Sequence, residues 1–266
     1  KCRAGKVSAV VELSDCRAVA AWVVREGVAP AAAAGWAARR PDGRWELSAG
    51  GAPEAGDAAE EAIFDLASVT KPMTAMAIAR SGLDRATPLG DVLPEARGTP
   101  SEGASLELLL AHRAGLEGHV ALYEPLLRGE AVDRAAALRA AASARRADAL
   151  GPVPPRGFSS IYSDLGYLLV GEALARHVGA VDAGEAIERL VVSPLGLGEA
   201  LGTARALAAR PIGFLGRVRP TEVVGWRGGD VRGVVHDENA WALTGSGGSG
   251  HAGMFGTARA VLAFGC

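Results

Sequence analysis

A change in apolar periodicity along the chain constrains the fold most strongly. Residues 7–13 and 18–25 are short apolar runs typical of strands. In the middle of the chain, apolar residues recur instead at the three- and four-residue spacing of a helix face. Strand-like segments around a helical middle predict an α/β layer with an inserted helical domain. We therefore expect a discontinuous α/β domain of residues 1–80 and 222–266, with a helical domain of residues 81–221 between its two parts.

The helical middle divides into segments that end at Gly or Pro, the residues that stop helices. A Gly/Pro-rich turn region up to about residue 60 precedes these segments, and short strands are predicted near the end at 221–226 and 231–235. Thr257 is predicted to cap one more helix. The predicted helices are 68–82, 105–112, 130–149, 165–179 and 184–192.

Composition and charge exclude several function classes. The 266 residues carry a net charge of −2, so neither nucleic acid nor an anionic membrane is an expected partner. No apolar run approaches the ~20 residues of a membrane span. The first residues lack both Met and a long apolar core, so we expect no signal peptide and a processed or partial start. Oligomeric state and compartment do not follow from these features.

Lysine usage singles out one residue. Only three of the 28 Lys and Arg residues are lysines, and Lys71 alone lies in the body of the chain. Arginine keeps its proton near neutral pH, whereas a desolvated lysine can lose it. Lys71 is therefore a candidate for a titrating role, and the alternative is a lysine left there by chance.

Ser68 lies three residues before Lys71, a spacing that places both side chains on one face of a helix. If Ser68 opens the helix, backbone amides and the positive end of the helix dipole stabilise an oxyanion there and oppose a charge on Lys71. Pro72 fits the first turn, where a missing N–H costs little. A neutral Lys71 amine can then accept the serine proton and make Ser68 a nucleophile.

A second candidate element follows the Pro-rich loop 151–160 and directly precedes a helix. Tyr162 would there be held at the edge of a cleft, and the alternative is a half-buried tyrosine bonded to the backbone. Asp164 can equally cap the helix.

The histidines and cysteines predict neither a metal site nor a cofactor. His112 and His119 lie near one helix end, and His236 is followed by two acidic residues, but no zinc-type spacing is present. We expect structural roles for these histidines. The three cysteines make neither a disulfide framework nor a metal knuckle.

Four segments, in order and across nearly the whole chain from about residue 18, resemble the class C β-lactamase and penicillin-binding-protein-like serine hydrolases. The nucleophile segment of that family resembles FDLASVTKPMTAMAIA, and its LLTHTSGL segment resembles LELLLAHRAGL. Its Y-x-N block resembles YSDLGYLLVGE. The glycine-rich turn and helix start of its esterase and peptidase members are similar to VHDENAWALTGSGGSGHAGMFGTARAVLAFG.

The resemblance implies a β-lactamase/transpeptidase-like fold, in which helices flank an antiparallel sheet, and a serine hydrolase acylated at Ser68. Lys71 and Tyr162 would share the general-base work. Asp164 stands where the family more often has Asn, and would contact Lys71 and the substrate. A carboxylate there favours the protonated amine, which shifts the base role toward Tyr162, and it repels an anionic substrate group.

The substrate class stays open at this point. The resemblance covers enzymes that cleave a small ester, an amide, a peptide or a β-lactam, and the charge of Asp164 favours a neutral ester or peptide. The alternative is a non-catalytic binding or sensor domain, for peptidoglycan or another ligand, that keeps the fold.

The third motif of the family, K-T-G or H-T-G on a strand, has one superficial match at residues 251–253. GSGGSG before it cannot supply a strand, and MFGTARAVLAF after it predicts a turn and then a helix. We reject the match and expect the motif, with the last strands, to lie beyond Cys266. A chain without that strand would lack one oxyanion donor and is expected to be unstable or poorly active.

Overall fold

The structure, a computed structural model, describes residues 15–52 and 61–266. In this part of the chain the strands form three small antiparallel sheets, ordered β1–β2, β3–β7–β4 and β5–β6. The strands are β1 (Ala33–Arg39), β2 (Trp45–Gly51), β3 (Phe64–Asp65), β4 (Leu201–Thr203), β5 (Val223–Val224), β6 (Gly229–Asp230) and β7 (Met254–Gly256).

Helices account for far more of the described residues than strands do, and none of them is long and apolar enough to cross a membrane. The predicted antiparallel sheet with helices around it and a helical middle is therefore confirmed. The helices are α1 (Cys16–Arg25), α2 (Thr70–Ser81), α3 (Leu89–Val92), α4 (Leu106–Leu110), α5 (Glu124–Leu127), α6 (Arg134–Ser143), α7 (Asp164–His177), α8 (Ala183–Ile187), α9 (Ala204–Ala208), α10 (Phe214–Arg217), α11 (Glu238–Thr244) and α12 (Ala258–Gly265).

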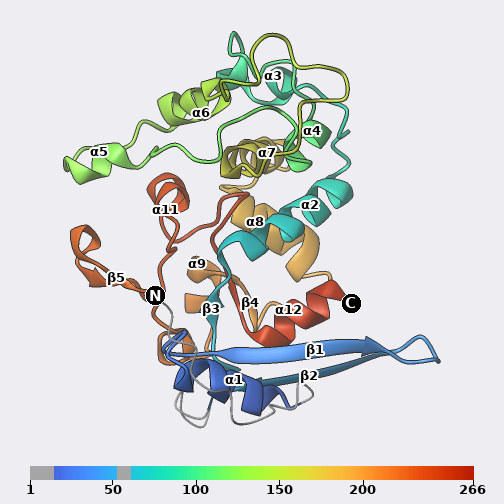
Figure 1. The fold of residues 1–266 in the computed structure, drawn as a ribbon, viewed down its shortest axis with the longest axis vertical. Helices are drawn as coiled ribbons and strands as arrows, with labels where there is room; N and C mark the ends of the chain where they lie inside the picture. Colours follow the sequence, from blue (N-terminus) through green and yellow to red (C-terminus); the bar gives the residue numbers. More distant parts are fainter. Residues whose placement is uncertain (1–14, 53–60) are drawn as a thin grey trace.

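The β1–β2 hairpin lies between α1 on one face and α12 on the other (Figure 1). Two glycines allow this close approach. A Cβ at Gly50 would lie 2.6 Å from Cγ of Arg17 in α1, and a Cβ at Gly35 would lie 2.6 Å from Cδ1 of Leu262 in α12. The expected turn region up to about residue 60 is wrong for β1 and β2, where glycines such as these let helices pack on a hairpin, and residues 53–60 lie outside the described residues.

Residues 18–25 form the greater part of α1, not the predicted strand. The Asp15 carboxylate accepts the Ala18 N–H at 3.0 Å and caps the helix. Cys16 and Ala20, four residues apart, turn one face of the helix toward the hairpin and are buried. A short apolar run is compatible with the residue spacing of either a strand or a helix, and here the Asp15 cap favours the helix. The strand predicted at 7–13 lies outside the described residues.

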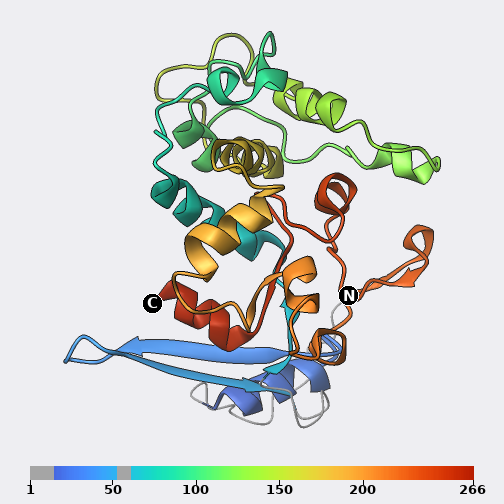
Figure 2. The same ribbon diagram turned by 180° about the vertical axis from the view of Figure 1, so that it is seen from behind.

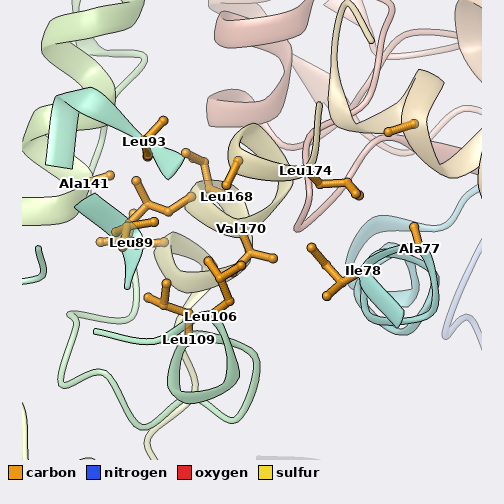
Figure 3. Close-up of a cluster of buried hydrophobic side chains, with 14 of the residues drawn as sticks. Ala77, Ile78, Leu89, Leu93, Leu106, Leu109, Ala141, Leu168, Val170 and Leu174 are labelled. Atoms are coloured by element: carbon orange, nitrogen blue, oxygen red, sulfur yellow. The ribbon is translucent and has the colours of Figure 1, made fainter. Parts of the chain in front are cut away.

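The helical part is built around α7, in which residues 165–175 are all buried. This helix packs against α2, α3, α4, α6 and α8. In Figure 3, Leu168 and Leu174 of α7 lie among side chains of α2, α4 and their neighbours, such as Ile78 and Leu106. A core of this kind fixes α2 against α7, and with them the segments directly before each helix, 67–69 and 161–163.

Local stop and start signals place most of the predicted helices correctly. Gly82, with φ +78°, ends α2. Ser105 caps α4, and Thr257 caps α12 by accepting the Ala260 N–H at 3.1 Å. The helix predicted at 130–149 is shorter, because Asp133 caps it only at Arg134.

The region from residue 200 to 256 departs most from expectation. Strand β5 lies within the predicted 221–226, but its partner is β6, and residues 231–235 are not a strand. The chain there turns at Gly233, with φ +67°. The predicted turn after residue 253 is instead strand β7, which pairs with both β3 and β4. These partners lie far away in the sequence, so no local pattern indicates the pairing.

Residues 245–253 form no strand, as predicted, and their glycines serve close packing. A Cβ at Gly250 would lie 2.0 Å from the Tyr167 carbonyl oxygen and 2.7 Å from Cα of Gly171, both in α7. On its other side, the Thr74 hydroxyl of α2 donates to the Gly250 carbonyl at 2.7 Å. This glycine segment (245–253) is therefore clamped between two helices.

The helical part and the β1–β2 hairpin lie at opposite ends of the molecule (Figure 2). We propose that residues 1–80 and 222–266 form one domain and residues 81–221 the other. Strand β4 belongs to the second range but pairs with β7 of the first, so the two proposed domains share this sheet.

Replacing Gly250 with Ala tests the packing of the glycine segment. Because the added Cβ meets backbone atoms that cannot rotate away, we expect Gly250→Ala to lower the free energy of unfolding by about 3 kcal/mol or more. Gly103→Ala is the control, since nothing lies within 4 Å of its Cβ position. It should change stability by less than about 0.5 kcal/mol. Equal urea midpoints for the two variants would contradict the tight packing.

Candidate active site

Ser68 lies in a sharp 3₁₀ turn, Ala67–Val69, between β3 and α2. Ala67 has φ +43°, a conformation rare for a residue with a side chain. The Asp65 carboxylate accepts the Ala67 N–H at 2.8 Å and holds this turn. Ser68 is exposed and precedes the first helical residue, Thr70, by two positions. A strained turn of this kind presents the serine at the surface beside the start of the helix.

Lys71 is buried in the first turn of α2, with 5% of its surface exposed. Its Nζ lies 2.8 Å from Ser68 Oγ, 2.7 Å from Asp164 Oδ1 and 3.2 Å from the His251 carbonyl oxygen. An ammonium group has three donors and no acceptor, so three acceptors match the charged form of lysine.

Tyr162 reaches Ser68 from the other side. Its hydroxyl donates to Ser68 Oγ at 2.8 Å, and its ring centroid lies 4.8 Å from Lys71 Nζ, within cation–π range. Tyr162 is 52% exposed, so it stands at the edge of the site while Lys71 lies beneath it. The structure thus brings together all four residues singled out in the sequence.

The residue that caps α7 is Ser163, not Asp164. The Ser163 hydroxyl accepts the Gly166 N–H at 3.4 Å and donates to the Glu117 carbonyl at 2.6 Å. Asp164 is the first residue of the helix itself. Because Ser163 caps the helix, the Asp164 carboxylate is available for Lys71.

His251 and Asp237 form a pair behind Lys71 that the sequence did not reveal. His251 Nε2 lies 2.8 Å from Asp237 Oδ1, and its Nδ1 lies 3.0 Å from the Ser249 hydroxyl. Burial alone would raise the pKa of Asp237, but the hydrogen bond and charge of His251, with smaller effects of the Ala240 N–H and the charge of His119, outweigh it and lower that pKa to about 2. With both ring nitrogens held, the His251 carbonyl keeps its position toward Lys71.

Asp65 connects the turn that carries Ser68 to the segment before α11. Its second oxygen accepts the His236 N–H at 2.7 Å. Burial raises the pKa of Asp65, and the N–H groups of His236 and Ala67 oppose that shift in part. A cleft of about 290 Å³ opens beside Ala67, next to Ser68, and is lined by Asp65, Ala67, Thr221, Glu222 and His236.

The histidines considered for metal binding have other partners. His236 Nδ1 lies 2.8 Å from the Thr221 hydroxyl, and His112 Nδ1 accepts the Ser163 N–H at 3.1 Å. Within residues 15–52 and 61–266, no three His, Cys, Asp or Glu side chains come together as a metal site would require.

The arrangement of sheets and helices defines a β-lactamase/transpeptidase-like fold, as the sequence resemblance implied. The chain belongs to the Beta-lactamase family, whose model matches residues 7–265. No curated protein sequence matches the chain.

Solved structures share this fold at low sequence identity. A class C β-lactamase from Rhodobacter sphaeroides has a TM-score of 0.60 and 20% identity; the match covers 94% of this chain and 64% of that one. EstCE1, a hydrolase with promiscuous acyltransferase activity, has a TM-score of 0.59 and 21% identity, with 92% and 69% covered. A D-alanine carboxypeptidase from Burkholderia cenocepacia has a TM-score of 0.56 and 20% identity, with 94% and 62% covered. The chain thus spans less than two thirds of the class C enzyme.

The Asp237–His251 pair predicts a pH-dependent contribution to stability. The pKa of Asp237 is about 2 in the folded chain, whereas an unfolded aspartate has a pKa of about 4. The pair therefore stabilises the fold fully above about pH 4, and this stabilisation is lost as the pH falls through about 2. We expect Asp237→Asn to lower the free energy of unfolding by about 2 kcal/mol at pH 7 and by about half as much at pH 3.

Urea unfolding at the two pH values measures this difference. Asp133→Asn, the same change at the cap of α6, is the matched control, because Asp133 Oδ1 also accepts a helix N–H, from Ala136 at 3.1 Å. The control should show a much smaller loss. A loss for Asp237→Asn that is the same at pH 7 and pH 3 would rule out the charged pair as its cause.

Proposed function

We propose that the protein is a serine hydrolase that forms an acyl-enzyme at Ser68 and cleaves a small ester, amide or peptide. One observation carries the proposal: Ser68 Oγ lies 2.8 Å from both Lys71 Nζ and the Tyr162 hydroxyl. Membership of the Beta-lactamase family supports it. So do the structural relatives, which include a hydrolase with promiscuous acyltransferase activity and a D-alanine carboxypeptidase.

In the proposed acylation, Tyr162 is the general base. Lys71 Nζ donates hydrogen bonds to Ser68, Asp164 and the His251 carbonyl. As an ammonium group it has no lone pair that could accept the serine proton. Its positive charge instead stabilises negative charge on the Tyr162 oxygen. In the proposed step the exposed Tyr162 hydroxyl first releases its proton to solvent, and the resulting phenolate takes the proton from Ser68. Ser68 Oγ then bonds to the substrate carbonyl carbon. As the bond to the leaving group breaks, Tyr162 returns the proton to that group.

Deacylation runs through the same residues with water in place of the leaving group. Tyr162 removes a proton from water, the hydroxide attacks the ester carbonyl, and the proton returns to Ser68 Oγ as that bond breaks. Tyr162 suits this step because it is 52% exposed, where water can reach it. Asp164 keeps Lys71 charged throughout, at 2.7 Å from Nζ.

The charges around Ser68 favour a neutral substrate. Asp164 contacts Lys71, and Asp65 and Glu222 line the cleft beside Ala67. An anionic substrate group would be repelled there, so a neutral ester or peptide fits better than a β-lactam with its carboxylate. We expect turnover of a p-nitrophenyl ester to exceed that of a chromogenic cephalosporin.

A fluorophosphonate probe tests the nucleophile directly. Wild type should be labelled on Ser68, and Ser68→Ala should lose all labelling, because the probe bonds covalently to an activated serine. Ser159→Ala, an exposed serine in the loop before Tyr162, should be labelled like wild type. If wild type is not labelled, the non-catalytic binding or sensor domain becomes the better interpretation.

Tyr162→Phe tests the base. Loss of the hydroxyl at 2.8 Å from Ser68 should slow labelling about 100-fold or more, the scale of general-base catalysis. Tyr123→Phe is the matched control, since Tyr123 stacks on Trp226 and no hydrogen bond of its hydroxyl to Ser68 is present. An unchanged rate for Tyr162→Phe would show that another group takes the proton.

A further inference from the structure

His112 contacts three consecutive residues of the segment that carries Tyr162. Its carbonyl oxygen accepts the Ile161 N–H at 3.1 Å, and its Nδ1 accepts the Ser163 N–H at 3.1 Å. Between them, the Tyr162 ring lies on the His112 ring, with centroids 4.8 Å apart and an angle of 31°. One residue thus binds the backbone on both sides of Tyr162 and the ring of Tyr162 itself.

The backbone of His112 is in an unusual conformation that permits these contacts. It follows α4 and has φ +57°, in the left-handed region that few residues other than glycine adopt. Such a conformation persists only where the surroundings hold it. The ring of Tyr167, in α7, lies 5.2 Å from the His112 ring and packs on it as well. His112 is therefore held between α7 and the loop before it.

The hydrogen bond from Ser163 requires a lone pair on Nδ1, so it exists only while that nitrogen carries no proton. Burial lowers the pKa of His112, the charge of Lys71 lowers it further, and the charge of Asp164 opposes the shift. The titratable groups that face His112 are Lys71 on α2, Asp164 and Tyr167 on α7, and Tyr162 on the loop. Nδ1 is thus free to accept the bond at neutral pH.

We propose that His112 is a positioning residue for the proposed base. Neutral His112 holds residues 161–163 so that the Tyr162 hydroxyl stays on Ser68 Oγ. Protonation of Nδ1 breaks the bond from Ser163, places a second cation near Lys71, and loosens the Tyr162 contact. Acylation of Ser68 then falls as the pH drops below the range in which His112 is neutral. This inference rests on the proposed function.

Two variants separate the contributions of His112. Asn tolerates the left-handed conformation, and its Oδ1 stands near the place of Nδ1 as an acceptor, but it cannot be protonated. Ala keeps neither the acceptor nor the ring. His177→Asn is the matched control, because His177 lies at the far end of α7 and its Nε2 is 3.3 Å from the Ser81 carbonyl oxygen.

The rate of fluorophosphonate labelling of the full chain is measured from pH 5 to pH 8. His112→Ala should be about 10- to 100-fold slower than wild type at pH 7.5, since misplacing a reacting group by about 1 Å costs up to that much. His112→Asn should recover most of this rate and should fall less than wild type toward pH 5. His177→Asn should follow wild type. Wild-type rates and pH profiles for both His112 variants would overturn the proposal, and so would equal slowing of Ala and Asn at every pH.

An NMR titration separates this proposal from the proposed function. The Ser163 amide resonance should shift with the ionisation of His112 in wild type and lose that shift in His112→Asn. If the probe does not label the chain but the Ser163 amide shift follows the ionisation of His112, the hydrolase proposal is refuted and the contact between His112 and Ser163 stands. A Ser163 amide that does not respond when His112 titrates overturns the contact itself.

Discussion

The ammonium group of Lys71 joins three parts of the chain that are far apart in sequence. Ser68 lies on the turn before α2, Asp164 begins α7, and His251 belongs to the glycine segment. A charge that is 5% exposed is costly unless its donors are all bonded, so each acceptor must reach the nitrogen. The packing of α2 on α7, and of the glycine segment on both, brings the three acceptors to that nitrogen. A small shift of any of the three would leave a buried donor unpaired.

The glycine segment shows how the chain meets this requirement with backbone atoms. The His251 carbonyl can approach Lys71 only because the backbone passes very close to α7, where Gly250 and Gly171 leave no room for a Cβ. Asp237 then fixes the His251 ring and also caps α11, so the position of the carbonyl is coupled to the start of that helix. The glycines here provide close packing and not flexibility.

The two partners of Ser68, Lys71 and Tyr162, differ in their exposure to solvent. Lys71 is enclosed and its three donors are all bonded, so in the proposed mechanism it supplies a positive charge beside the serine. Tyr162 is half exposed and contacts the same oxygen, so in the proposed mechanism water and substrate can reach it. An exposed side chain keeps its position only if the backbone that carries it is held. His112 accepts hydrogen bonds from the backbone N–H groups on both sides of Tyr162. This arrangement fits the proposed mechanism, in which buried Lys71 provides a fixed positive charge and the Tyr162 phenol transfers the proton.

The sequence by itself determined the local features. The spacing of Ser68 and Lys71, the stop at Gly82 and the cap at Thr257 are signals within one helix, and short-range hydrogen bonds and sterics decide them. Only the tertiary structure decided the rest. Whether Asp164 capped a helix or met a lysine depended on Lys71, 93 residues away, and the carbonyl of His251 is 180 residues from the same nitrogen. Strand β7 and helix α1 both differ from the sequence prediction. A short apolar run has no fixed conformation of its own, and a cap at Asp15 or pairing with distant strands selects one.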